Sequence, residues 1–246
     1  MKLADRAYNH IKAMLIEGRL QAHAWLPVDS IAAELGSSRQ PVMDAMKRLA
    51  IEGFVEIVPQ VGSRVMKPDP QDIDDFYRLF AAGEGLIAEL CAARAGPADI
   101  VQLRLISDQI GALKAAQQSD QVKGESYRML NRRLHAEMRR ISRSRPLADL
   151  VESLGDRSDF YVALNSPNMF ALNLDRAHAE HDSIIEAIAR GDKAGASEAM
   201  IAHIFATERR VLEPGEKPAK RGAKRSSVTV AATARQAGAR RSVKTA

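Results

Sequence analysis

The sequence contains one cysteine, Cys91, among its 246 residues. A single cysteine excludes a disulfide within the chain and is typical of a reducing compartment. Cys91 lies in the apolar run 90–93. Because free cysteines usually behave as small buried hydrophobes, we expect Cys91 in the core rather than at a nucleophilic site.

Long apolar runs are also missing, and aromatic residues make up only 4% of the sequence. No stretch approaches the ~18 consecutive apolar residues that a membrane span needs. Residues 1–6 lack the apolar run of a secretory signal peptide. These absences predict a cytoplasmic protein without a membrane partner, and 246 residues suffice for two domains with separate cores.

Charge is distributed unevenly along the chain. Residues 214–246 hold nine Lys and Arg against one acidic residue, a net charge of +8, so residues 1–213 carry −3 of the chain's +5. The same segment is rich in Ala, Ser and Gly and has no apolar periodicity, which predicts a disordered basic tail. Such a tail either aids solubility or binds nucleic acid without sequence preference.

The stretch 35–49 predicts the turn and second helix of a helix-turn-helix. Gly36 can adopt the positive φ that ends a helix, and Ser37 or Ser38 can cap the next helix, with Pro41 in its first turn. An apolar stripe then recurs at helical spacing: Val42, Ala45, Met46 and Leu49. The start of this second helix would enter a DNA major groove.

A winged helix-turn-helix domain is predicted for residues 1–68. Apolar residues between positions 3 and 16 have helical spacing, and Gly18 ends that helix. After the helix-turn-helix, residues 54–58 and 63–66 are predicted strands on either side of a turn at 59–62. Three helices and a β-hairpin make up this kind of DNA-binding head.

The region 69–213 has a helical pattern throughout. Boundary signals predict six helices at about 72–95, 97–116, 122–142, 146–164, 172–190 and 193–211. Six amphipathic helices favour an antiparallel bundle. The predicted fold class is therefore mainly α, with an N-terminal winged helix-turn-helix followed by an all-α six-helix bundle.

Three histidines of the helical region are spaced as metal ligands. Asn131 and His135 are four residues apart, so both leave one helix face. His181 lies on an apolar stripe and points inward, and His203 lies on the next helix, which folds back antiparallel. Three imidazoles and one amide oxygen can bind a divalent ion and leave positions open for water or a ligand oxygen. A lone inward histidine is more often a hydrogen-bonded core residue, so both interpretations stay open here.

A metal-dependent hydrolase is an alternative, because three histidines with open coordination positions can activate water. The sequence places no Asp or Glu as a general base. Glu180 precedes His181 and points roughly 100° away around the helix, so we expect it to face solvent. A DNA-binding head would also be unexplained, and we therefore predict that the chain is not an enzyme.

Residues 35–55 closely resemble the signature of the GntR family of bacterial transcription regulators, Ser-Arg-Thr-Pro-Val-Arg-Glu-Ala-Leu followed by Leu-x-x-x-Gly-Leu-Val and a glycine-containing wing. The four candidate ligands at 131, 135, 181 and 203 resemble the metal-binding pattern of the FCD branch, named after the C-terminal domain of the fatty-acid regulator FadR. The resemblance spans about residues 5–211. It implies a nucleoid-associated homodimer that binds a palindromic operator, here predicted to be a repressor, under the control of a small organic acid.

The resemblance also assigns site residues. Its DNA contacts correspond to recognition-helix residues, with Gly62 at the wing tip: Ser38, Arg39, Gln40, Lys47, Arg48, Gly62 and Arg64. Its metal ligands, for zinc or nickel, correspond to Asn131, His135, His181 and His203. The domains it implies are a head at 1–68, an effector-binding and dimerisation domain at 69–213, and the tail.

Several positions depart from the family pattern. Asp29 and Met43 stand where the family commonly has arginines, so two donors to DNA are lost. Asn131 replaces the usual Asp, which weakens one metal ligand. Phe80 and Ala81 lie where an arginine near Glu84 often holds a carboxylate.

Arg78, one helical turn before Ala81, is a candidate effector contact, although a solvated surface role is the alternative. A further function left open by the sequence is an architectural DNA binder that uses the basic tail and needs no ligand.

Overall fold

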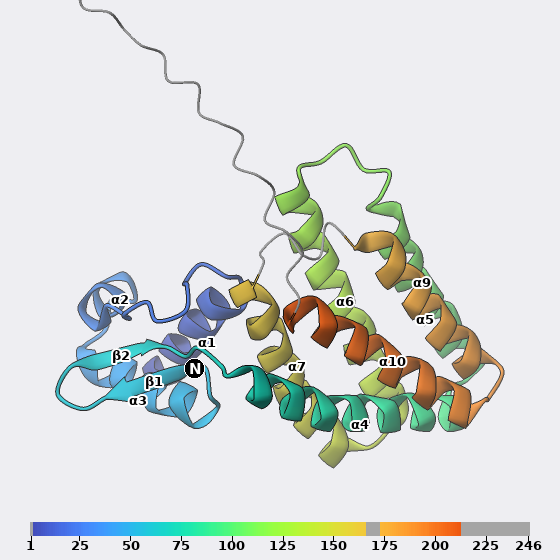
Figure 1. Cartoon of the computed structure of the whole chain (residues 1–246), viewed down its shortest axis with the longest axis horizontal. Coiled ribbons are helices and arrows are strands. Elements are labelled where there is room, and N and C mark those ends of the chain that lie inside the picture. The colour runs from blue at the N-terminus through green and yellow to red at the C-terminus, as the bar shows by residue number, and fades with distance from the viewer. Residues whose placement is uncertain (1, 166–172, 213–246) are drawn as a thin grey trace, which may run out of the picture. The chain divides into compact units, whose positions relative to one another are not determined.

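The computed structural model describes residues 2–165 and 173–212; the predicted basic tail lies outside the described residues. The first part is a winged helix-turn-helix, as predicted (Figure 1). Its elements are α1 (Leu3–Ile16), α2 (Val28–Glu34), α3 (Arg39–Ile51), β1 (Val55–Val58) and β2 (Gly62–Val65). The two strands are antiparallel, with Val55 opposite Val65 and Val58 opposite Gly62.

Glycines end the helices of the head where the sequence predicts. Gly36 and Gly53 follow α2 and α3 with φ of +59° and +78°, a conformation that L side chains rarely adopt. Two details of the prediction are wrong. Ser38 occupies the N-cap of α3, but neither serine caps the helix, since the Ser37 hydroxyl donates to the Ser38 carbonyl at 3.1 Å. Gly62 opens β2 instead of lying at the wing tip, because the turn is completed within residues 59–61.

The second part is the predicted helical bundle (Figure 1). Among the described residues it contains α4 (Pro70–Arg94), α5 (Pro97–Ala112), α6 (Asp120–Ser142), α7 (Arg145–Asn165), α9 (Leu174–Ala189) and α10 (Lys193–Leu212). Most helix ends lie within two residues of the prediction, and the largest difference is the end of α5 at Ala112. None of these described helices is long and apolar enough to cross a membrane.

Close packing along α4 depends on two glycines. A Cβ on Gly85 would lie 2.8 Å from Cγ1 of Ile201, and one on Gly83 would lie 2.9 Å from Cγ2 of Val151. α4 can therefore pack tightly against α10 and α7, and it also contacts α6 and α9. Cys91 on α4 is fully buried, as expected, and burial raises the pKa of its thiol to about 12.

Side chains of the head also pack on the bundle. The ring of Phe54, just after α3, lies 5.1 Å from the ring of Phe160 on α7, measured between centroids. Both rings are at most 1% exposed. The Arg128 guanidinium of α6 donates to the Ile16 carbonyl at the end of α1, at 2.7 Å. An apolar and a polar contact thus join the winged helix-turn-helix to the helical bundle.

Candidate metal centre and ligand cavity

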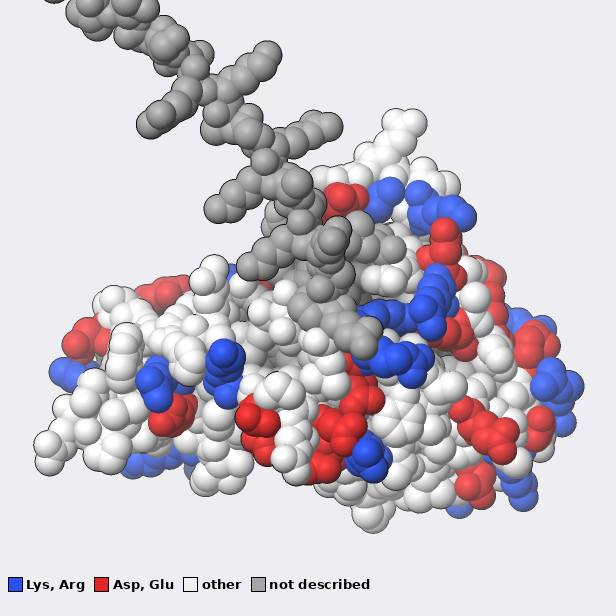
Figure 2. Space-filling model, viewed as in Figure 1, with Lys and Arg blue, Asp and Glu red and all other residues white. Residues whose placement is uncertain are grey.

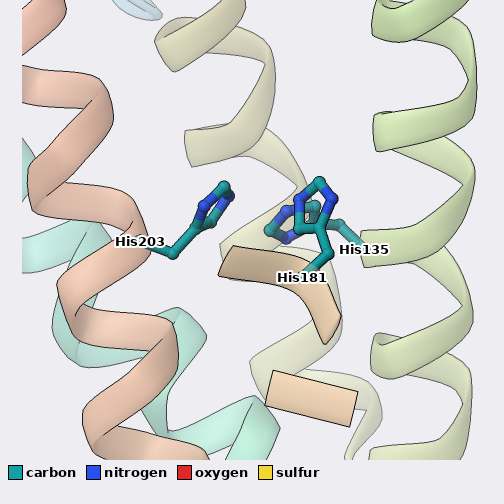
Figure 3. A group of neighbouring side chains, drawn as sticks. All are labelled: His135, His181 and His203. Atoms are coloured by element: carbon teal, nitrogen blue, oxygen red, sulfur yellow. The ribbon is translucent and has the colours of Figure 1, made fainter. Parts of the chain in front are cut away.

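The three histidines singled out from the sequence converge inside the bundle (Figure 3). His135 comes from α6, His181 from α9 and His203 from α10. Their ring centroids are 4.7 to 5.9 Å apart, and one nitrogen of each lies within 4.8 Å of the others. All three residues are buried, with exposed fractions of 7%, 0% and 4%. The three histidines, which lie on three different helices, therefore form a single cluster, as their positions in the sequence predicted.

Carboxylates orient two of the three rings. Nδ1 of His135 lies 3.1 Å from Oε1 of Glu84, and Nδ1 of His203 lies 2.8 Å from Oε2 of Glu180. A neutral imidazole that donates from Nδ1 keeps the lone pair of Nε2 free. Metal-binding histidines are commonly held in this tautomer by an outer carboxylate. Glu84 and Glu180 therefore prepare both rings as ligands.

The expectation that Glu180 faces solvent is wrong. Its side chain is 18% exposed and accepts hydrogen bonds from both His203 and Arg210 of α10, the latter at 2.7 Å. The 100° offset correctly turns Glu180 away from the His181 face of α9, but α10 packs beside α9 at that angle. Burial opposes ionisation, yet the His203 hydrogen bond and the Arg210 charge together lower the pKa of Glu180.

His181 is the strongest indication that the cluster binds a ligand. Both of its ring nitrogens are buried, and neither has a hydrogen-bond partner among the described residues. Burial and the neighbouring His203 and His135 hold the pKa of His181 well below its usual value, and burial also lowers the pKa of His203. Both rings are thus neutral and can offer lone pairs at neutral pH. Buried polar groups without partners are rare in native proteins, and a divalent ion would satisfy this set of imidazoles.

A cavity of about 310 Å³ adjoins the cluster. His135, His203 and Asn131 line it, so the side chains at i and i+4 share the cavity face as predicted. The Asn131 amide oxygen lies 3.5 Å from the Tyr127 hydroxyl. The structure thus brings Asn131 to the wall of the cavity.

Arginines are the cavity residues that the sequence interpretation missed. Arg132, Arg139 and Arg210 all line the cavity, and Arg139 is 3.6 Å from the buried carboxylate of Glu84. Arg139 follows Asn131 and His135 at the same four-residue spacing, so this periodicity could have identified it. Arg78, the predicted effector contact, lies outside the lining of this cavity; its side chain is 68% exposed and pairs with Asp74.

The predicted DNA contacts lie on exposed parts of the head, and their cationic side chains have acidic neighbours. Arg39 is 3.3 Å from Asp29, and Gln40 and Lys47 both donate to Asp44. The face in Figure 2 likewise shows Lys and Arg side chains among Asp and Glu.

The arginines of the wing and of the last turn of α3 also have acidic partners. Arg48 pairs with Asp5 at 2.9 Å, and its guanidinium lies 4.1 Å from the Tyr8 ring centroid. Arg64 of the wing pairs with Glu56 at 2.8 Å.

A winged helix-turn-helix joined to a helical bundle that contains a cavity is the architecture of a transcriptional regulator with a ligand-binding domain. Residues 3–65 match the family model of the bacterial regulatory proteins of the gntR family, and residues 75–206 match that of the FCD domain. The chain therefore belongs to the GntR family and carries an FCD domain, and its relatives are transcriptional regulators rather than enzymes.

Two curated relatives illustrate this similarity. The helix-turn-helix regulator YdhC of Bacillus subtilis (strain 168) is 25% identical over 196 residues, which are 80% of this chain and 85% of the relative. The transcriptional repressor GlaR of Escherichia coli (strain K12) is 24% identical over 200 residues, 80% of this chain and 90% of the relative.

Solved structures show the same fold. The structure of McbR/YncC of E. coli has a TM-score of 0.72 at 20% identity, and the match covers 87% of this chain and 99% of that one. A GntR regulator of Rhodococcus sp. RHA1 has a TM-score of 0.67 at 17% identity, covering 85% and 97%.

Proposed function

We propose that the chain is a homodimeric, cytoplasmic repressor that binds a palindromic operator and responds to a small organic acid in the bundle cavity. The observation that carries this proposal is the fully buried His181, which has no hydrogen-bond partner within residues 2–165 and 173–212, beside His135 and His203 and next to a cavity lined by arginines. A divalent ion, zinc or nickel, would be held by these histidines, with Asn131 at the cavity wall as a candidate fourth ligand. The ion would supply positive charge and open positions for a ligand oxygen.

The proposed DNA contacts are those of the recognition helix and the wing: Ser38, Arg39, Gln40, Lys47, Arg48, Gly62 and Arg64. In a dimer, two such helices would read half-sites about one helical turn apart, so the operator would be palindromic. A ligand in the cavity would change DNA affinity only by binding the two head arrangements unequally. The acidic partners of Arg39, Lys47 and Arg48 would then be exchanged for phosphates and base edges.

Three measurements on the full chain test the proposal. Metal analysis of protein purified without chelator or affinity tag is expected to give about one zinc or nickel per chain. DNA selection from a random pool is expected to return a palindrome. A thermal-shift screen of small carboxylates on the metal-loaded protein is expected to find an acid that also releases that DNA. A metal-free protein that no acid stabilises, or an unselective DNA binder, would contradict the proposal.

A further inference from the structure

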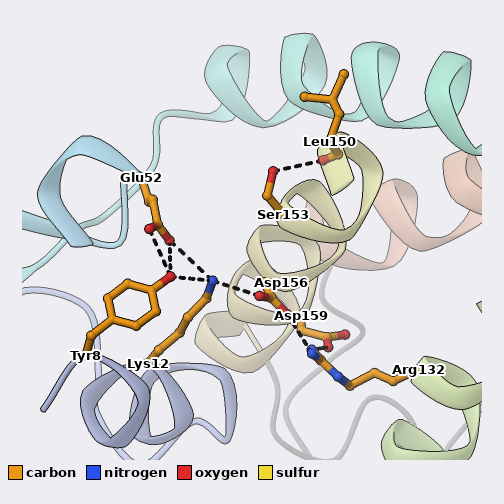
Figure 4. A network of polar contacts seen from close by, with 8 residues as sticks. All are labelled: Tyr8, Lys12, Glu52, Arg132, Leu150, Ser153, Asp156 and Asp159. Carbon is orange, nitrogen blue, oxygen red and sulfur yellow. Dashed lines mark hydrogen bonds and ion pairs between the residues drawn. The ribbon is translucent and has the colours of Figure 1, made fainter. Parts of the chain in front are cut away.

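A chain of ion pairs runs from the cavity wall to the head (Figure 4). Arg132 of α6 donates to Asp159 at 2.7 Å and to Asp156 at 2.6 Å, both on α7. The second carboxylate oxygen of Asp156 lies 2.7 Å from the Lys12 ammonium of α1. Asp156 is therefore shared between a cation of the bundle and a cation of the head.

On the head side, the contacts continue to the end of the recognition helix. Lys12 donates to the Tyr8 hydroxyl at 2.8 Å, and Tyr8 donates to Oε2 of Glu52 at 2.6 Å. Glu52 is the C-cap residue of α3, the helix that carries Arg39. A displacement of the Lys12 ammonium would therefore alter contacts of α1 and of the C-terminal end of α3 together.

On the bundle side, the same residues form part of the cavity wall. Arg132, Asp156 and Asp159 all line the cavity. The side chains of Lys12 and Asp156 are only 14% and 15% exposed, so solvent screens this pair less than it screens surface pairs. Asp159 is 10% exposed and Arg132, its partner, is 43% exposed. Burial raises the pKa of Asp159, partly offset by the nearby Arg132 charge, which makes the carboxylate dependent on that guanidinium.

We infer that Arg132 couples ligand in the cavity to the DNA-reading head through Asp156 and Lys12. This inference rests on the proposed function of the cavity as an effector site. An anionic ligand that pairs with Arg132 competes with Asp156 and Asp159 for one guanidinium. The Lys12–Asp156 pair then changes strength, and with it the orientation in which the head is held. Ligand binding and DNA binding become linked, because the ligand favours the head arrangement in which Arg132 is free.

The chain offers a matched control for this route. Arg128 also joins α6 to α1, through the Ile16 carbonyl at 2.7 Å, but it does not line the cavity. Arg128→Gln therefore breaks a contact between bundle and head of similar length, while the ion pairs of Arg132, Asp156 and Lys12 keep both of their partners. The inference requires that Arg128→Gln and Lys12→Met differ in their effect on coupling.

The first experiment needs no ligand. DNA affinity is measured in a double-mutant cycle on the full chain: the wild type, Lys12→Met, Arg132→Met and the double variant. The same four measurements are then repeated with Asp156→Asn present in every protein. Within the described part of the chain, no hydrogen bond or ion pair joins Lys12 directly to Arg132, whereas both contact Asp156, so the route predicts that coupling between them depends on Asp156. We expect the double variant to depart from additivity by at least about threefold, and the departure to vanish with Asp156→Asn. Additive effects within about 1.5-fold overturn the inference; Arg132→Lys replaces Arg132→Met if the latter does not fold.

The second experiment uses acetate, a small carboxylate, as the anionic probe on the metal-loaded full chain, with chloride at equal ionic strength as the reference. The ratio of DNA affinities in acetate and in chloride is expected to differ from 1 by about fivefold in the wild type and in Arg128→Gln, and to fall to 1 in Lys12→Met. Equal responses of Lys12→Met and wild type overturn the route. An intact double-mutant coupling with a wild type that ignores acetate contradicts the proposed effector site instead, so the two failures are distinguishable.

Discussion

Replacing His181 by Asn should remove most of the stabilisation that a metal ion gives this protein. His181 contributes one of the three nitrogens that lie within 4.8 Å of one another, close enough for small movements of the rings to bring them to bonds of about 2.0–2.1 Å around one ion. It is also the ligand without a carboxylate partner among the described residues, so its loss removes a donor without breaking a hydrogen bond.

The size of the effect follows from linkage. Zinc at a hundred times its Kd stabilises the folded state by about 2.7 kcal/mol. For a chain of this size, 1 kcal/mol corresponds to roughly 2–4 °C in Tm, so the wild type should gain about 5–11 °C. If His181→Asn weakens the Kd about a hundredfold, the same zinc concentration leaves roughly 0.4 kcal/mol, or ~1–2 °C.

Differential scanning fluorimetry at fixed zinc concentrations measures both shifts. His23→Asn is a matched control, because His23 lies in the head with φ of +63°, a conformation that Asn tolerates well. The control should keep the full zinc shift. A His181→Asn variant that folds and gains as many degrees as the wild type would refute the assignment of His181 as a ligand.

Three further outcomes are expected. Arg39→Ala should cost roughly 1–3 kcal/mol of discrimination between base pairs in a competition assay, whereas an equal loss on all DNA would make Arg39 a phosphate contact. The metal-free protein should lose stability as pH falls below about 6.5. The pKa values of His181 and His203 are lowered in the folded state, so the unfolded chain binds more protons than the folded one. The free energy of unfolding should therefore fall by up to about 1.4 kcal/mol per pH unit for each ring. Urea unfolding at several pH values checks this, and a flat profile would contradict it. Phe160→Ala should cost about 3–5 kcal/mol in urea unfolding, because Phe160 is fully buried against Phe54; a loss under 1 kcal/mol would mean that this packing contributes little.

Local signals in the sequence were sufficient for the elements of the fold. Gly18, Gly36 and Gly53 each follow a helix with positive φ, and these stops could be predicted because few other residues adopt that conformation cheaply. The spacing that puts Asn131 and His135 on one helix face, and the apolar stripe that places His181 inward, depend on the 3.6-residue period alone. Such features are set within one element, so one sequence suffices to predict them.

Contacts between elements were harder to predict. The position of Glu180 relative to its own helix was correct, but its partner His203 lies on α10, and the rotation of that helix about its axis is not written in any local pattern. For the same reason, the sequence did not show which arginines reach the cavity. Arg78 pairs with Asp74 on its own helix, whereas Arg132 and Arg210 reach the cavity from other helices. The sequence places side chains on faces, whereas packing decides which faces meet.

The acidic partners in the head affect the base contact that we propose for Arg39. Asp29 and Met43 remove two arginines that the family commonly has, which leaves Arg39 as the leading candidate for reading guanine. Asp29 lies 3.3 Å from Arg39, and both side chains are about 70% exposed, so this pair adds little stability and phosphates can displace it. Asp29 therefore competes only weakly for the guanidinium, and we expect Arg39 to exchange this carboxylate for a guanine edge or a phosphate at little cost in free energy.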